Sequence, residues 1–203
     1  MSKVTSIHKG REGDRPKARL LDLLARHAYR YDSTKPFLLA SGGKSDEYIN
    51  CKDALSLPET MEALAKVVYP LLPGSVEAIG GLTMGADPIA VGVSLFSANR
   101  PRRVRWFSVR KEAKKHGLRR EIEGGVPAGA RVAIVDDVVT QGGSTLDAIR
   151  KCRSAGLSIK RVIVLVDRQQ GGLEKIKAEV GADVRVIAIF TKAQVHARWK
   201  ALQ

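Results

Sequence analysis

A short apolar run that leads directly into two carboxylates constrains this chain more than any other feature. Residues 132–135 are apolar and mostly β-branched, and Asp136 and Asp137 follow them at once. Such a run predicts a buried strand of a parallel sheet, which is apolar on both faces. Parallel sheets of this kind bind ligands at the carboxyl ends of their strands. The acid pair therefore stands where a ligand is expected.

The residues after the acid pair predict a phosphate site. Gly142 and Gly143 let the backbone come close to a ligand, and Ser144 offers a hydroxyl group. A helix is predicted to begin at this point, and its free N–H groups and its dipole favour an anion. An acid pair beside a phosphate cradle indicates a sugar phosphate whose hydroxyls or metal face the carboxylates. The alternative is an ordinary turn after a core strand.

Length and composition indicate one α/β domain. The chain has 203 residues, of which 44% are hydrophobic, and this is enough to form a core. No apolar stretch approaches the roughly 20 residues of a membrane span, and residues 1–16 lack the apolar centre of a secretory signal. Cys51 and Cys152 have no metal-ligand spacing and are too few for a disulfide framework. The cytoplasm is therefore the simplest location for the protein.

The charge balance favours an anionic ligand. Lys and Arg number 35 against 21 Asp and Glu, a net charge of +14, which suits nucleic acid or a phosphorylated small molecule. The positive residues are dispersed except for a cluster at 110–120, and aromatic residues are only 5% of the chain. Because no aromatic-interleaved basic stripe is present, the sequence does not favour a nucleic-acid partner, and a small phosphorylated substrate is expected.

Predicted helices and strands alternate along the chain. Helices are expected over 16–31, 58–72, 88–98, 145–155 and 173–180 and from 192 onward. Strands are expected over 76–80, 104–109, 132–135, 161–166 and 184–189, with two short ones within 37–52. Residues 1–16 are predicted to be a flexible arm and 111–125 a long mobile loop of the lid type. This alternation predicts a mostly parallel sheet covered by helices.

The central stretch resembles a known signature. Val135-Asp-Asp-Val-Val-Thr-Gln-Gly-Gly-Ser-Thr145 is similar to the 5-phosphoribosyl 1-diphosphate motif of type I phosphoribosyltransferases. The resemblance implies their fold, a mostly parallel central sheet flanked by helices in a single domain over 1–203. It also implies Mg²⁺ bound through substrate and water near the acid pair, without direct protein ligands. The implied donor-binding residues are Asp136, Asp137, Val138, Val139, Thr140, Gln141, Gly142, Gly143 and Ser144.

The basic segment Arg110-Lys-Glu-Ala-Lys-Lys-His-Gly117 resembles the catalytic loop of orotate phosphoribosyltransferases. The resemblance implies that four residues bind the diphosphate and, together with the acid pair, are catalytic: Arg110, Lys111, Lys114 and His116. Cations aimed at a leaving diphosphate stabilise its developing charge, and a closing loop excludes water. In this family the loop enters the neighbouring subunit's site, which implies a homodimer with a shared lid. The alternative is a solvated run of charges.

Two further segments resemble the same family at its base site. The stretch 37–50 is similar to the segment that forms a hood over the nucleobase, within an N-terminal part at 17–57, and it places Tyr48 and Ile49 beside orotate. The alternative is a plain hairpin with Tyr48 in the core. Arg168 matches the arginine that binds the orotate carboxylate, a role suited to its planar fork, although it could be an ordinary surface residue. Thr140 is implied to face the base as well.

Two positions depart from the family's pattern. Ala40 and Met84 stand where many members carry lysines near the ligand, which weakens the assignment of the base more than that of the donor. The resemblance implies transfer of a phosphoribosyl group to orotate, giving orotidine 5′-phosphate and diphosphate. Two alternatives stay open: a phosphoribosyltransferase for another nucleobase, and a nucleic-acid-binding regulator with the same fold.

Overall fold

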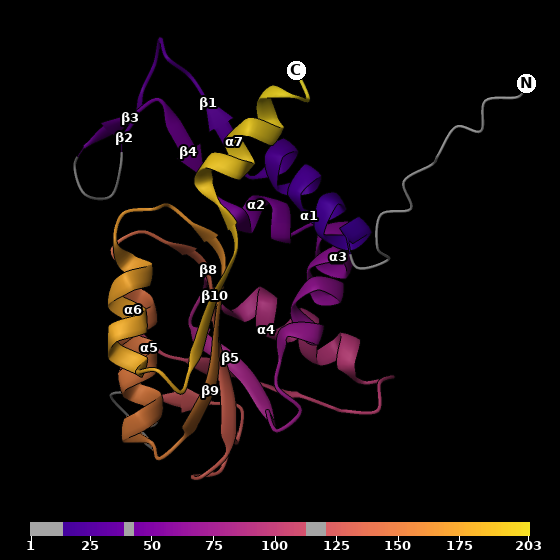
Figure 1. The fold of residues 1–203 in the computed structure, drawn as a ribbon, viewed down its shortest axis with the longest axis vertical. Coiled ribbons are helices and arrows are strands. Elements are labelled where there is room, and N and C mark those ends of the chain that lie inside the picture. The colour runs from indigo at the N-terminus through magenta and orange to yellow at the C-terminus, as the bar shows by residue number, and fades with distance from the viewer. Residues whose placement is uncertain (1–13, 39–42, 113–120) are drawn as a thin grey trace, which may run out of the picture.

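A six-stranded sheet forms the centre of the molecule. The computed structural model describes residues 14–38, 43–112 and 121–203 (Figure 1). Along the sheet the strand order is β10-β9-β8-β5-β6-β7, and every neighbouring pair is parallel except β6 with β7. The strands are β5 (Ala78–Leu82), β6 (Arg105–Val109), β7 (Ile122–Glu123), β8 (Arg131–Val139), β9 (Ser158–Asp167) and β10 (Arg185–Thr191).

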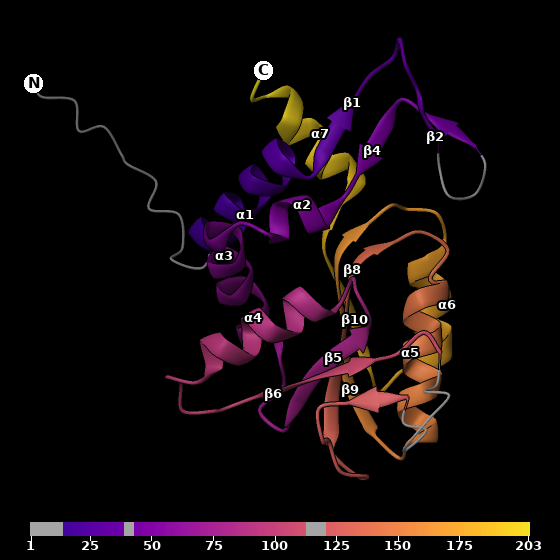
Figure 2. The ribbon, with the colours of Figure 1, turned by 180° about the vertical axis from the view of Figure 1, so that it is seen from behind.

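Helices cover both faces of this sheet (Figures 1 and 2). One face carries α1 (Asp14–His27), α2 (Cys51–Leu55), α3 (Pro58–Val68), the 3₁₀ turn η1 (Tyr69–Leu71) and α4 (Asp87–Ser97). The other face carries α5 (Gly143–Ser154) and α6 (Gly172–Val180). The predicted α/β class with a mostly parallel, helix-flanked sheet is confirmed.

The apolar residues of β8 divide between the two faces because successive side chains of a strand point in opposite directions. Val132 and Ile134 lie in the core under α5 and α6, whereas Ala133 and Val135 lie in the core shared with α1, α3 and α4. This division explains why the run is apolar at every position. It also sets the directions in which the next two residues, Asp136 and Asp137, point.

A hood of four short strands lies beyond the carboxyl ends of the sheet (Figure 1). Strand β1 (Tyr29–Tyr31) pairs with β4 (Glu47–Ile49), and β2 (Phe37–Leu38) pairs with β3 (Lys44–Ser45), both antiparallel. Glu47 joins the hood to α7 (Lys192–Lys200): it accepts a hydrogen bond from the Tyr29 hydroxyl at 2.7 Å and pairs with Lys192 and His196. The C-terminal helix therefore holds the hood above the sheet.

Several boundaries differ from the predictions. The strand expected at 132–135 continues through both acids to Val139, because β9 runs alongside and pairs with it up to that residue. The helix expected over 16–31 ends at His27, and Tyr29–Tyr31 instead forms β1, whose partner lies 18 residues further on. Helix α2 was not predicted. For both strands a partner distant in sequence decides the boundary, and local periodicity does not show it.

The predicted lid over 111–125 contains a strand that the sequence did not indicate. Ile122 and Glu123 form β7 and pair antiparallel with Val109 and Ser108 of β6. Ile122 also packs against the core beneath α5, so one apolar residue within a charged segment anchors this end of the loop. Residues 1–13 of the predicted arm at 1–16 and residues 113–120 of the predicted lid lie outside the described residues. The prediction of an arm is wrong for residues 14–16, which form the start of α1. In the described part, no helix is long and apolar enough to cross a membrane.

Candidate functional site

The acid pair lies near the carboxyl end of β8, with its two side chains held by different elements. The Asp136 side chain points to the same face of β8 as that of Ile134. Its Oδ2 accepts a hydrogen bond from the Thr145 hydroxyl of α5, and Oγ1 and Oδ2 are 2.6 Å apart. Asp137 continues the face of Val135, and its Oδ2 lies 3.1 Å from the Nζ of Lys52 in α2. Strand alternation thus gives two identical neighbouring residues different partners.

Asp136 is a buried carboxyl group. Only 4% of its surface is exposed, and its Oδ1 accepts the backbone N–H of Asp137 at 3.0 Å. Burial raises the pKa of Asp136 to about 7, the nearby Asp137 carboxylate adds to this effect, and the Thr145 hydrogen bond opposes it. Thr145 is therefore the group that most favours the ionised form of this carboxyl.

Lys52 is a site residue that the sequence did not reveal. It lies 85 residues from Asp137 along the chain, and no local motif connects the two positions. Burial alone would lower the pKa of Lys52, but its contact with the Asp137 carboxylate outweighs burial and raises the pKa overall. The ammonium group therefore stays charged. About half of the side chain, 47%, is exposed to solvent.

The glycine-rich segment forms the predicted cradle. Gly142 has a φ of +83°, a left-handed conformation that glycine adopts without strain, and α5 begins at the next residue. The backbone of 138–145 surrounds a small hollow of about 30 Å³ beside Asp136, and Ser144 on its rim is exposed. The free N–H groups of the first turn of α5 border this hollow. The arrangement suits a phosphate group.

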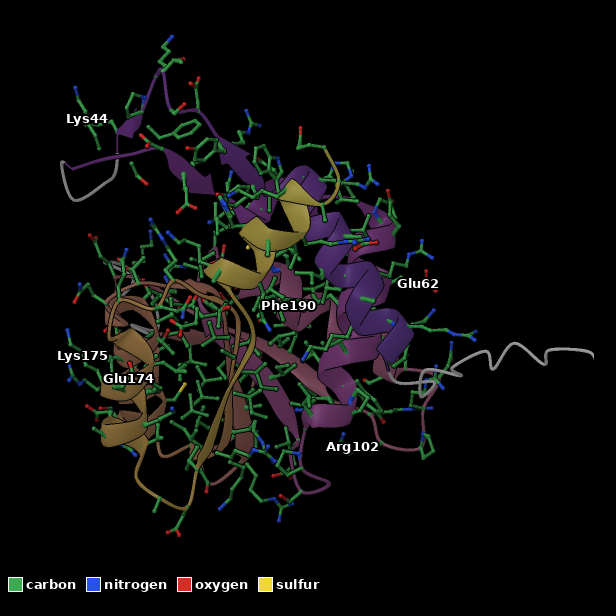
Figure 3. All side chains as sticks on the ribbon, turned by 45° about the horizontal axis from the view of Figure 1, so that its top comes forward. Lys44, Glu62, Arg102, Glu174, Lys175 and Phe190 are labelled. Carbon is green, nitrogen blue, oxygen red and sulfur yellow. The ribbon has the colours of Figure 1, made fainter. Side chains whose placement is uncertain are left out.

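A second loop, between β9 and α6, packs directly on the cradle. The Arg168 N–H donates to the Val139 carbonyl at 2.9 Å, and the Gly172 N–H donates to the Thr140 carbonyl at 3.0 Å. Lys175 of α6 lies on the outside of the molecule (Figure 3). Its ammonium group donates to the side chain of Gln141 at 3.0 Å. The Nε of Arg168 is buried and has no hydrogen-bond partner among the described residues. The backbone that carries the Arg168 side chain is therefore joined to the cradle by hydrogen bonds.

The loop between β5 and α4 passes beside the acid pair. A Cβ atom added to Gly85 would lie 2.5 Å from Oδ1 of Asp137 and 3.1 Å from Oδ1 of Asp136, so only glycine fits there. The Thr83 hydroxyl donates to Asp87 at 2.6 Å, and the Thr83–Met84 peptide bond is cis. Met84 is 65% exposed. The position that the family often fills with a cation is therefore an exposed thioether here, and Ala40, the other departure, lies outside the described residues.

Tyr48 and Ile49 occupy different environments in β4. Tyr48 is 38% exposed and stacks on Phe37, with ring centroids 5.5 Å apart and planes inclined by 26°. Ile49 is partly buried and packs against the main core. The alternative in which Tyr48 is a core residue is therefore wrong. The exposed ring of Tyr48 is therefore better placed to contact a base than the partly buried side chain of Ile49.

The described residues at the start of the basic loop are held by α5. Lys151 donates to the carbonyl groups of Arg110 and Lys111 at 2.9 and 2.8 Å, and the Arg110 guanidinium lies 3.7 Å from Glu123. Lys151 comes eight residues after Gly143, about 12 Å along the helix axis. Arg110 and Lys111 are thus not brought to the acid pair of this chain. Lys114 and His116 lie outside the described residues.

The acid pair offers the oxygen ligands that Mg²⁺ prefers, but few of them. Within 14–38, 43–112 and 121–203, no group of three or more His, Cys, Asp or Glu residues could hold a metal ion. Each of the four carboxylate oxygens already accepts a hydrogen bond, from Thr145, from Lys52, or from the backbone N–H of Asp137 or Val138. Such a donor set fits an ion that receives most of its ligands from a phosphorylated substrate and water.

Comparison with known proteins identifies the family. No family model matches the chain. A curated orotate phosphoribosyltransferase of Nostoc sp. is 41% identical over 187 residues, which cover 92% of this chain and 88% of the relative. The chain belongs to the orotate phosphoribosyltransferase family. The family resemblance stated from the motifs is thereby confirmed.

Solved structures of the family share the fold. The orotate phosphoribosyltransferase of Mycobacterium tuberculosis H37Rv in complex with Fe(III) dicitrate has a TM-score of 0.75 and 30% identity, covering 89% of this chain and 98% of that one. The same enzyme in complex with 5-phospho-α-D-ribosyl 1-diphosphate has a TM-score of 0.69 and 26% identity, covering 93% and 98%. The predicted type I phosphoribosyltransferase fold is confirmed.

Proposed function

We propose that this chain transfers the 5-phosphoribosyl group from 5-phospho-α-D-ribose 1-diphosphate to orotate, giving orotidine 5′-phosphate and diphosphate. One observation carries the proposal: a phosphate cradle begins within three residues of two carboxylates at the carboxyl end of a central strand. A sugar phosphate fits this order, with its phosphate in the cradle and its hydroxyls on the acids. The family membership supplies the reaction in which such a donor is used.

The donor side of the site uses groups that are already oriented. Backbone N–H groups at 140–144 and the Ser144 hydroxyl bind the 5′-phosphate at the positive end of α5. Asp136 and Asp137 accept hydrogen bonds from the ribose hydroxyls. Both are fixed by their own partners before the donor arrives, so little reorganisation is needed on binding.

The acceptor side uses Arg168. A guanidinium group matches a carboxylate through two parallel hydrogen bonds, and the Nε of Arg168 is a buried donor without a partner among the described residues. Because the Arg168 loop is hydrogen-bonded to the cradle, a base held there lies next to the donor. Thr140 belongs to the same pair of loops, and Tyr48 closes the site from the hood.

The reaction needs no covalent intermediate with the protein. The N1 anion of orotate attacks C1 of the ribose as the bond from C1 to the diphosphate oxygen breaks, and the electron pair leaves with the diphosphate. When bound, Mg²⁺ would neutralise part of the negative charge on the diphosphate, with Asp136 and Asp137 as its nearest protein oxygens. The protein residues orient the two substrates and exclude water from the reacting carbon.

We also propose a homodimer in which the basic loop serves a neighbouring site. The start of this loop, at Arg110 and Lys111, is held against the middle of α5 and not against the acid pair of its own chain. A loop anchored there can supply its cations to a second copy. Size-exclusion chromatography with light scattering tests this arrangement, and a monomer with full activity would contradict it. The cytoplasmic location expected from the sequence stays a prediction.

The decisive experiment follows the absorbance of orotate. We expect a loss of orotate absorbance that requires both the phosphoribosyl donor and Mg²⁺, with diphosphate released in equal amount. Turnover of adenine, guanine or uracil without turnover of orotate would contradict orotate as the acceptor, while the assignment of the phosphoribosyl donor would stand. If no base is consumed and the protein binds duplex DNA in a salt-dependent manner, the enzymatic proposal fails and the regulator is favoured.

A further inference from the structure

Among the described residues, neither the loop that borders the acids nor the start of the basic loop brings a cation to the leaving-group end of the site. A diphosphate beside Asp136 and Asp137 is repelled by two carboxylates unless positive charge is close. The loop that borders the acids, Thr83-Met-Gly-Ala-Asp87, contains no lysine or arginine. The Arg110 side chain lies beside Glu123, and the backbone at Arg110 is held by Lys151. Within the described part of this chain, a cation from another element is therefore needed near the carboxylates, besides those that the basic loop of a second copy would supply.

The directions of the two acids show on which side that charge is needed. Asp136 faces α5 and the phosphate cradle through Thr145. Asp137 faces α2 through Lys52 and lies closest to Gly85. A ribose that spans both acids with its 5′-phosphate in the cradle directs its C1 end away from α5. That end lies on the side of Asp137, Gly85 and Lys52.

We propose that Lys52 binds the diphosphate of the donor as a further substrate-contacting residue, an inference that rests on the proposed function. Its ammonium group carries three N–H donors, of which one serves Asp137 at 3.1 Å. The other two have no partner among the residues that the structure describes, so they can donate to diphosphate oxygens. Lys52 thereby stabilises the charge that develops as the bond to C1 breaks, and it offsets the repulsion from Asp137.

The position of Lys52 in α2 suits this role. Its neighbours Cys51, Ala54 and Leu55 are buried and fix the short helix against the core, while about half of the Lys52 side chain stays open to solvent. The helix therefore presents an anchored, accessible cation at the edge of the site. The raised pKa of Lys52 keeps it charged at neutral pH.

The test compares Lys52→Met with Lys52→Arg and with Lys66→Met as the matched control. Lys66 is also half-exposed and paired with a carboxylate, that of Glu62 in the same helix, but it lies in α3 away from the acids. Binding of magnesium diphosphate and of ribose 5-phosphate is measured by calorimetry, and steady-state kinetics give KM for donor and orotate. Melting temperatures report on folding.

We expect Lys52→Met to weaken magnesium diphosphate and to raise the donor KM by about ten- to a hundredfold, the effect of losing a charged hydrogen bond. Ribose 5-phosphate and orotate should bind within about twofold of wild type. The diphosphate affinity and the donor KM of Lys52→Arg should lie closer to those of wild type than the values of Lys52→Met do. Lys66→Met should change none of these values. Equal weakening of ribose 5-phosphate and diphosphate, or equal loss in the Arg and Met variants, would overturn the inference in favour of a structural role.

The same measurements separate this inference from the proposed function. If wild type consumes orotate and Lys52→Met keeps its affinity for diphosphate, the function stands and the role of Lys52 is wrong. If wild type consumes no orotate but binds magnesium diphosphate in a Lys52-dependent manner, the acceptor is wrong and the role of Lys52 stands. If wild type binds neither diphosphate nor the donor, both are wrong.

Discussion

Gly172 joins the two loops that the proposed reaction must keep together, so replacing it with alanine is a sharp test of the site. Its N–H donates to the Thr140 carbonyl of the cradle at 3.0 Å. A Cβ atom at Gly172 would lie 2.4 Å from that same oxygen, 2.6 Å from Cγ1 of Val139 and 2.7 Å from the N of Gly142. Two of these three atoms are backbone and cannot turn aside. Gly172→Ala must therefore move the cradle.

The size of the effect follows from these distances. Ordinary contacts with carbon are about 3.5 Å, so the cradle has to shift by roughly 1 Å. Overpacking of this kind costs about 1–3 kcal/mol, which for a chain of this size lowers the melting temperature by about 2–12 °C. A 1 Å displacement of groups that position a substrate can cost about a hundredfold in rate. We expect a loss of about that size in kcat/KM for the donor.

Gly171 provides a matched control for the assay. It precedes Gly172, has a φ of +81°, and an added Cβ would meet nothing within 4 Å. Gly171→Ala therefore introduces backbone strain of about 1–2 kcal/mol without pushing on the cradle. Steady-state kinetics and thermal melting are measured for both variants. If Gly172→Ala keeps kcat/KM for the donor within about threefold of Gly171→Ala, the two loops are not coupled as the structure indicates.

Three further predictions concern single side chains. The pKa of Asp136 is raised to about 7 in the folded protein, whereas an ordinary aspartate has a pKa near 4. Between these two pH values the folded protein keeps a proton on Asp136 that the unfolded chain has lost. The free energy of unfolding of the ligand-free protein should therefore fall from pH 5 to pH 7 more steeply in wild type than in Asp136→Asn, and equal slopes in urea denaturation would contradict this. Arg168→Lys should raise the orotate KM about tenfold or more while the donor KM stays within about twofold, because lysine cannot make the paired hydrogen bonds; a larger change in the donor KM would speak against the carboxylate role. Lys114→Ala should reduce kcat far more than it weakens orotate binding, and an unchanged kcat would show that the basic loop is not catalytic.

The part of the site that could be predicted from sequence is the part built from neighbouring residues. An apolar run, an acid pair and two glycines before a helix lie within 14 residues, and each has a local physical reason. The cradle at Thr140–Ser144 follows from the left-handed Gly142 and the start of α5. The fold class follows in the same way from the alternation of strands and helices.

The remainder depends on pairings that the local pattern does not contain. Strand β8 extends through Asp136 and Asp137 because β9 pairs alongside, and two carboxylates give no sign of a continuing strand. Tyr29 continues the helical apolar pattern, yet it enters a strand because β4 supplies a partner. Lys52 reaches Asp137 only once α2 packs against β8. Long-range packing decides all three, and a single sequence does not show it.

The position of the acids within β8, and not after it, makes the two residues unequal. Had the strand ended at Val135, both carboxylates would lie in a loop with similar exposure. Because the strand continues, alternation directs Asp136 beneath α5, where burial favours its neutral form, and Asp137 toward the ammonium group of Lys52. The two acids are therefore not interchangeable. On one side, a ligand bound across them meets the Asp136 carboxyl group, which takes up a proton readily. On the other side it meets the Asp137 carboxylate and the accessible ammonium group of Lys52.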